Sequence, residues 1–150
     1  MHEANHRTRS ISKILSANDT GETGAHQAGM LVPKQEEILS FFPPVNRDEL
    51  NPRHHLVFYD TQDERWEFAF IYYNNALFGG TRNEFRLTRM TPFIKQNRLV
   101  CGDELILERN ASGRYLVRYV RPKSTGRGVD GVLRLGSTWK VIDMRHGGKK

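Results

Sequence analysis

Residues 66–73 read WEFAFIYY and carry the clearest strand pattern in the chain. Aromatic side chains recur at every second position of this stretch, at Trp66, Phe68, Phe70 and Tyr72. Two residues is the spacing at which the side chains of a β-strand return to the same face. The residues between the aromatic ones begin with the charged Glu67 and continue with apolar and aromatic types. We therefore predict a long strand that is half-buried at first and buried on both faces towards its end.

Similar patterns on either side predict about seven strands in all. They cover residues 9–15, 28–32, 54–59, 66–73, 103–109, 114–120 and 138–142. A further alternation restarts at Phe85 and Leu87, and residues 110–113 (NASG) have the composition of a hairpin turn. One or two short helices are predicted, one of them between Pro33 and Pro43. Because the strands do not alternate with helices, we expect a mainly β chain whose antiparallel sheet forms a partly open barrel.

The chain is basic, with a net charge of +6 and a pI of 9.7 over 150 residues. This charge favours a polyanionic partner, because a protein that neutralises phosphates releases their counterions. A basic domain without such a partner is the alternative. We expect a flexible N-terminus over residues 1–10, one domain over 11–145 and a linker or tail over 146–150. The single cysteine, Cys101, fits a reducing bacterial cytoplasm, and no apolar segment resembles a secretion signal or a membrane span.

Nothing in the sequence predicts an active site. The commonest restriction-nuclease core places an acidic residue two positions before a lysine, so that carboxylates hold Mg²⁺ beside the ammonium group. None of the seven lysines has an acidic residue at that position. Cys101 has no base near it in the sequence and is expected to be an ordinary buried cysteine. We therefore expect a chain that is not an enzyme and that needs no metal or other cofactor.

Two polar segments have the chemistry to contact DNA. The first, residues 13–27, is rich in small and polar residues and is expected to be an extended arm or loop with little reason to be buried. The second, residues 79–89, places Arg82, Glu84 and Arg86 at alternate positions, so that an extended segment presents them on one face. Arginine can bind guanine and glutamate can accept from cytosine. For the first segment the alternative is an ordinary loop, and for the second it is a surface row of salt bridges.

Several uncommon strings, in order over roughly residues 11–90, resemble the effector domain of EcoRII-type (type IIE) restriction endonucleases. They are LSANDTGETGAHQAG at 15–29, FPPVN at 42–46, ELNP at 49–52, YYNNALFG at 72–79, and TRNE at 81–84 followed by Arg86. The chain departs from the family pattern at Gly80 and Phe85, where the family has lysines, and at Leu31, where it has a tyrosine.

The resemblance implies a pseudobarrel of the kind found in plant B-three domains. Two arms would grip the major groove of double-stranded DNA at a CCWGG-like site: the first arm is residues 13–27 and the second arm is residues 80–86. It implies DNA contacts from Lys13, Ser16, Asp19, His26, Gln27, Thr81, Arg82, Asn83, Glu84, Arg86 and Arg89. Among these, His26 and the three residues Arg82, Glu84 and Arg86 would read bases, and Lys13 and Arg89 would reach phosphates.

In this family the domain is the allosteric half of a larger nuclease, so the implied partners are DNA and a separate catalytic domain that requires Mg²⁺. Two other function classes stay open at this point. One is a minimal nuclease with an unrecognised active site. The other is a domain that binds RNA or protein, although the aromatic residues of 66–73 follow core periodicity rather than that of an exposed stacking surface.

Overall fold

The computed structural model of the chain describes residues 8–24, 29–122 and 139–142, and in these it has eight strands and four short helices. The strands are β1 (Arg9–Ile14), β2 (Met30–Val32), β3 (Arg53–Tyr59), β4 (Arg65–Tyr73), β5 (Glu84–Thr88), β6 (Glu104–Arg109), β7 (Tyr115–Val120) and β8 (Trp139–Ile142). The helices are α1 (Ala17–Thr20), α2 (Glu36–Leu39), the 3₁₀ helix η1 (Asn75–Phe78) and α3 (Thr91–Gln96). The predicted mainly β class is confirmed, and the alternation at Phe85 and Leu87 is a strand of its own, β5.

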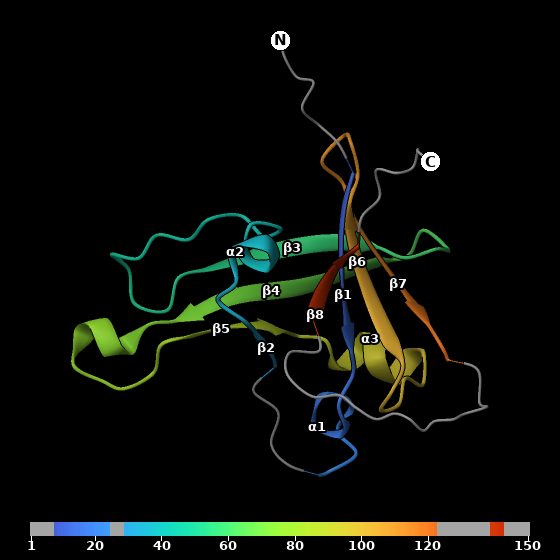
Figure 1. The fold of residues 1–150 in the computed structure, drawn as a ribbon, viewed down its shortest axis with the longest axis horizontal. Helices are drawn as coiled ribbons and strands as arrows, with labels where there is room; N and C mark the ends of the chain where they lie inside the picture. Colours follow the sequence, from blue (N-terminus) through green and yellow to red (C-terminus); the bar gives the residue numbers. More distant parts are fainter. Residues whose placement is uncertain (1–7, 25–28, 123–138, 143–150) are drawn as a thin grey trace.

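All eight strands belong to one sheet in the order β2-β5-β4-β3-β7-β6-β1-β8. Neighbours are antiparallel except β3 and β7, which are parallel. Figure 1 shows β3, β4 and β5 running along the long axis of the molecule, with β1, β6, β7 and β8 crossing them steeply. The sheet thereby curls round into the barrel-like, B-three-like form that the sequence predicted.

Within the described residues, the two ends of the sheet are joined by a side chain rather than by a ladder of backbone hydrogen bonds. Strands β2 and β8 are the two ends of the sheet order. The indole Nε1 of Trp139 on β8 donates to the carbonyl oxygen of Leu31 on β2 at 2.9 Å. This bond links the two sheet edges, so the predicted open pseudobarrel is an accurate description of the fold.

Strand β4 has the burial that its sequence predicted. Phe68, Phe70 and Tyr72 are buried in the core, and the ring of Phe70 stacks on that of Phe42 with centroids 4.3 Å apart. The strand begins half-buried, with Trp66 packed against the core between two exposed residues. From Phe68 onwards, Ala69 and Ile71 on its other face are buried as well. The candidate site lies on this other face, the one that carries Ala69 and Ile71.

Part of the first arm is helical, although its composition predicted an extended arm or loop. Residues 17–20 form the single-turn helix α1, which a capping box begins. The backbone N–H of Asp19 donates to Ser16 Oγ at 3.1 Å, and the backbone N–H of Ser16 donates to Asp19 Oδ2 at 2.9 Å. Gly21 ends the turn with a left-handed φ of 85°. The missed signal was the Ser-x-x-Asp spacing, a variant of the capping box in which Asp replaces Glu.

Helix α2 lies between Pro33 and Pro43, where a short helix was predicted. None of the helices in the described part of the chain is long and apolar enough to span a membrane.

Candidate nucleic-acid interface

The second arm lies on the face of the sheet that points away from the aromatic core. The register of β5 against β4 places Glu84 opposite Tyr73 and Arg86 opposite Ile71. On the next strand, Arg53 of β3 is also opposite Ile71. Residues directly opposite each other in an antiparallel ladder share a face. Two arginines, a glutamate and a tyrosine from three strands are thereby brought onto one surface.

Glu84 holds the arginines on both sides of it. Its Oε2 accepts from Arg82 Nη2 at 2.8 Å and from Arg86 Nε at 2.6 Å. These hydrogen bonds, that of Arg82 first and that of Arg86 next, lower the pKa of the Glu84 carboxyl below its ordinary value, against a smaller opposing effect of burial. The row of salt bridges recognised as an alternative from the sequence is present, and it aligns three groups that can also bind base edges.

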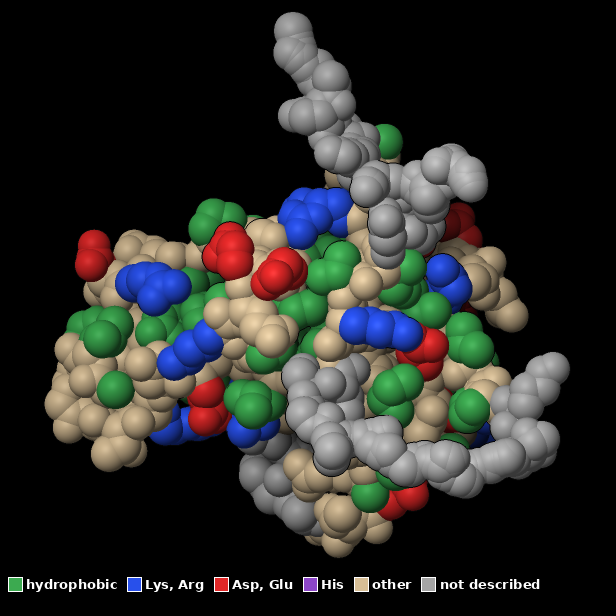
Figure 2. Space-filling model, in the orientation of Figure 1, with side chains coloured by type: hydrophobic (Ala, Val, Ile, Leu, Met, Phe, Trp, Pro, Cys, Tyr) green, Lys and Arg blue, Asp and Glu red, His purple; other side chains and the backbone are tan. Residues whose placement is uncertain are grey.

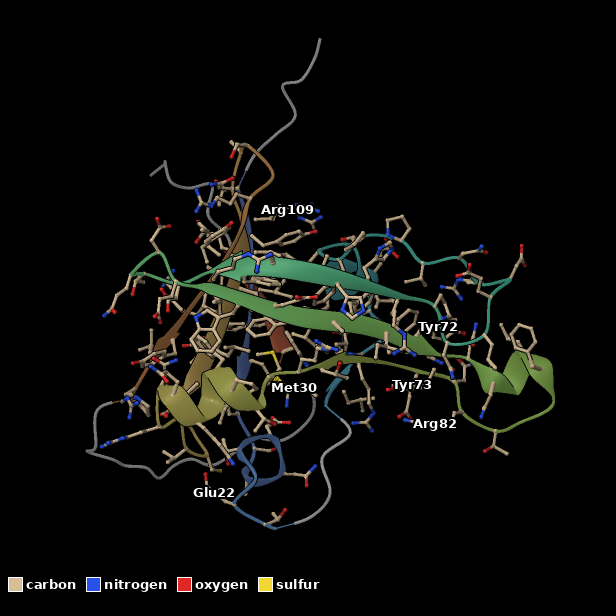
Figure 3. The ribbon with its side chains drawn as sticks, turned by 180° about the vertical axis from the view of Figure 1, so that it is seen from behind. Glu22, Met30, Tyr72, Tyr73, Arg82 and Arg109 are labelled. Carbon is tan, nitrogen blue, oxygen red and sulfur yellow. The ribbon has the colours of Figure 1, made fainter. Side chains whose placement is uncertain are left out.

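The two arginines of this row are held differently. Arg86 also donates from Nη1 to the carbonyl oxygen of Gly29 at 2.8 Å, which ties it to the chain just before β2. The guanidinium of Arg82 instead lies over the ring of Tyr73, 4.0 Å from its centroid. Figure 3 shows Arg82 and Tyr73 beside each other on this face. Arg82 is the more exposed of the two, with a side-chain exposure of 41% against 21%.

Between these residues Asn83 is exposed, but the oxygen of its side chain is bonded to β4. The buried hydroxyl of Tyr72 donates to Asn83 Oδ1 at 2.7 Å. Thr81 is exposed beside it. In the second arm, therefore, Thr81 and Asn83 are exposed, although the carbonyl group of the Asn83 side chain is engaged. The row Arg82, Glu84 and Arg86 is partly exposed.

The first arm is anchored by a buried ion pair. The Lys13 ammonium group contacts Asp19 Oδ2, and these residues are only 8% and 9% exposed. The expectation that this segment has little reason to be buried is therefore wrong for Asp19. Lys13 lies on the core face because it is opposite Leu105, a fully buried residue. Ser16 is exposed, but its hydroxyl is used by the cap.

Further along the first arm, Glu22 ties the arm to the loop before β6. Its Oε2 accepts from the backbone N–H of Cys101 at 2.7 Å and from Thr20 Oγ1 at 2.6 Å. The bonds from Thr20 and Cys101, in that order, lower the pKa of the Glu22 carboxyl. The expectation that Cys101 is buried is wrong, because the residue is exposed. His26 and Gln27 lie outside the described residues.

A groove with a volume of about 430 Å³ lies between the two arms. Residues of both arms line it: Asp19 from the first, Arg82 from the second, and Arg89 just after β5. Arg53 and Tyr73 line it as well. The charged residues in this lining are three arginines and Asp19, and Lys13 already neutralises Asp19. The groove therefore favours an anionic ligand. Figure 1 shows α1 below the sheet and η1 at its far end, on either side of β2.

Arg89 has an unusual backbone conformation at the rim of this groove. Its φ is 66°, in the left-handed region that residues other than glycine rarely adopt. The residue is exposed, so its guanidinium is available at the surface. Figure 2, in the orientation of Figure 1, shows basic side chains among acidic and apolar ones on that face of the molecule.

Sequence reasoning missed Arg53 and Tyr73 as members of this surface. Tyr73 could have been assigned, because it has the opposite parity to Trp66 and Phe68 on the same strand. Arg53 could not, since its position depends on the β3–β4 register. In the described part of the chain, no cluster of three or more His, Cys, Asp or Glu side chains could hold a metal ion.

Comparison with known proteins gives related sequences of two kinds. A family model described as "Restriction endonuclease EcoRII, N-terminal" matches residues 4–103. The chain is 46% identical over 82 residues to the type II restriction enzyme EcoRII of Escherichia coli, an alignment that covers 51% of this chain and 20% of that protein.

The second kind of relative comes from plants. Auxin response factor 3 of Oryza sativa subsp. japonica is 31% identical over 101 residues, covering 67% of this chain and 12% of that protein. Auxin response factor 22 of Arabidopsis thaliana is 25% identical over 138 residues, covering 92% of this chain and 20% of that protein. The chain thus spans a fifth or less of the length of these relatives. Since the family model matches more than half of its length, the chain belongs to the family of EcoRII N-terminal domains.

Proposed function

We propose that this chain binds double-stranded DNA at a specific short sequence, with the groove between its arms facing the duplex. The observation that carries the proposal is the row Arg82–Glu84–Arg86, which faces outward beside that groove. Membership of the EcoRII N-terminal family supports it. Arg53 and Arg89 add positive charge on the same side, as a phosphate backbone requires.

The row has the chemistry to read G·C pairs. A guanidinium donates two parallel hydrogen bonds to guanine O6 and N7, and a carboxylate accepts from the amino group of cytosine. Glu84 already holds both guanidinium groups in place, so less side-chain entropy is lost when DNA binds. A site rich in G·C pairs, such as CCWGG, fits this set of donors and acceptors.

The remaining parts of the proposal concern the rest of the nuclease. The chain acts as the effector half of a restriction endonuclease in the cytoplasm of a bacterium, and DNA bound here regulates a separate catalytic domain. That domain supplies the Mg²⁺ chemistry, whereas this chain alone neither cuts DNA nor needs a cofactor. Mg²⁺-dependent cutting by the purified chain would refute this part of the proposal.

The experiment that tests the central claim is a salt-titrated gel shift. The chain is titrated onto a short CCWGG duplex and onto a shuffled duplex of equal composition. We expect a preference of about a thousandfold or more, the usual range for specific binders. Tight but equal binding to both would contradict sequence-specific recognition, and preferential binding to a matched RNA duplex would contradict the choice of DNA.

A further inference from the structure

The side chain of Asn75 holds the backbone of Arg82 at the base of the second arm. Asn75 Oδ1 accepts from the backbone N–H of Arg82 at 2.6 Å. On the other side of the same residue, the Arg82 carbonyl oxygen accepts from the backbone N–H of Ala76 at 2.8 Å. Both polar groups of the Arg82 backbone are thus bonded to the start of η1.

This arrangement replaces the strand ladder at the point where the ladder ends. The last β4–β5 pair joins Tyr73 and Glu84, and Arg82 lies beyond it. Without a strand partner, the backbone of Arg82 is placed by the bonds from Asn75 and Ala76. The guanidinium position over Tyr73 and beside Glu84 depends on that placement.

Gly80 supplies the space that the Asn75 carboxamide occupies. A Cβ atom added at Gly80 would lie 2.6 Å from Asn75 Cγ, 2.7 Å from Oδ1 and 2.9 Å from Nδ2. These separations are shorter than any ordinary contact with a Cβ atom. The backbone N–H of Gly80 also donates to the Asn75 carbonyl oxygen at 2.7 Å, which keeps the two residues together.

The neighbouring glycine offers a contrast. Gly79 has a left-handed φ of 98°, but a Cβ atom added there would meet nothing within 4 Å. Gly79 is therefore required for its backbone conformation, whereas Gly80 is required for the room it leaves beside Asn75.

We propose that Asn75 is a positioning residue that sets how sharply Arg82 discriminates between bases, and that it can do so only while residue 80 is glycine. The proposal rests on the proposed function, since it assigns Arg82 to base reading. Any side chain at position 80 displaces the carboxamide, releases the Arg82 N–H and loosens the guanidinium.

The test compares the ratio of affinities for CCWGG and shuffled duplexes among Asn75→Ala, Asn75→Asp, Gly80→Ala, Gly79→Ala and the double variant Asn75→Ala/Gly80→Ala. Thermal unfolding of each variant shows that it is folded. Asn75→Ala and Gly80→Ala should each lower the ratio about tenfold, the effect of one poorly read base pair. Asn75→Asp keeps an acceptor oxygen and should keep the ratio, even if its charge weakens both affinities alike.

Two comparisons separate this role from general loop stability. In the double variant, Gly80→Ala should add little to the loss caused by Asn75→Ala, because both changes act on one hydrogen bond. Gly79→Ala should leave the ratio unchanged although it strains the backbone. Additive losses, or an equal loss in Gly79→Ala, would overturn the proposal.

A readout that does not need DNA keeps the two proposals distinguishable. Amide hydrogen exchange should be faster at Arg82 in Asn75→Ala than in the parent chain. If the parent chain fails to prefer CCWGG, the proposed function is wrong while the exchange rate still tests the placement of Arg82. If the parent chain discriminates and Asn75→Ala discriminates equally well, the role of Asn75 is wrong.

Discussion

Lys13 and Asp19 form an ion pair inside the first arm, where both side chains are less than a tenth exposed. Asp19 Oδ2 accepts from the Lys13 ammonium group and from the backbone N–H of Ser16, so one oxygen joins β1 to the start of α1. Removing only one partner of a buried pair leaves an uncompensated charge away from water. The pair is therefore expected to govern whether the first arm keeps its shape.

Asp19→Ala should destabilise the chain by about 3–5 kcal/mol, the usual effect of leaving a buried charge unpaired. The double variant Lys13→Met/Asp19→Ala should recover most of that loss, because no unpaired charge remains. It should not recover all of it, since loss of the Asp19 carboxylate also weakens the cap by about 1 kcal/mol. Urea unfolding of the three chains measures these differences, and a loss below about 1 kcal/mol in Asp19→Ala would contradict a buried pair.

Arg82→Ala should reduce discrimination between CCWGG and shuffled DNA by about 1–3 kcal/mol, because one arginine–guanine contact is lost. Arg114 offers a matched control on the hairpin between β6 and β7. Its guanidinium lies 3.9 Å from the centroid of the Tyr59 ring and pairs with Asp63 at 3.1 Å, at a side-chain exposure of 46%. This repeats the stacking and pairing of Arg82 away from the groove.

Competition gel shifts at one salt concentration compare the two variants. Arg114→Ala should not lower the affinity ratio by more than the error of the measurement. If both alanine variants weaken specific and shuffled binding equally, Arg82 reads no base.

Arg89→Ala should weaken binding to all sequences alike and reduce the slope of log affinity against log salt by about 0.9, the value for one lost phosphate contact. Arg98 is the control, since it is also an exposed arginine with a left-handed backbone, φ 53°, and it does not line the groove. Arg98→Ala removes the same charge from a similar left-handed backbone, where alanine keeps the Cβ atom as it does at position 89, and should leave the slope nearly unchanged.

The same salt titration tests Lys13, which the family resemblance places at a phosphate. Because its ammonium group is buried against Asp19, Lys13→Met should cost stability without flattening the slope. A slope reduced by about 0.9 in a folded Lys13→Met chain would show that Lys13 turns outward to bind DNA.

The sheet could be predicted well from the sequence because its strands are defined by local alternation. Trp66, Phe68 and Phe70 identify β4 by parity alone, and the same parity assigns Glu84 and Arg86 to one face. Each of these inferences needs only the two-residue period of a strand. The Arg82–Glu84–Arg86 row could be predicted for that reason.

What could not be predicted depends on contacts between distant segments. The burial of Lys13 follows from its pairing opposite Leu105, more than ninety residues along the chain. The position of Arg53 beside the second arm likewise follows from strand register. Cys101 is exposed in the loop before β6, where its backbone N–H donates to the Glu22 carboxylate of the first arm. No local pattern encodes these three placements.

The Glu84 carboxyl makes the stability of the row Arg82–Glu84–Arg86 depend on pH. Arg82 and Arg86 lower its pKa in the folded chain, while in the unfolded chain it has its ordinary value of 4.5. A group whose pKa is lower in the folded state stabilises that state fully above its unfolded pKa, and the stabilisation is lost as pH falls through the folded pKa. Glu84→Gln removes this contribution.

The difference in unfolding free energy between the parent chain and Glu84→Gln should therefore be constant from about pH 8 to pH 5.5 and should shrink at lower pH. Other acidic groups titrate in the same range, but they are common to both chains and cancel in the difference. Urea unfolding at several pH values measures it. A difference that varies between about pH 5.5 and 8, or that stays constant down to about pH 3, would mean that the arginines do not hold Glu84 ionised in the folded chain.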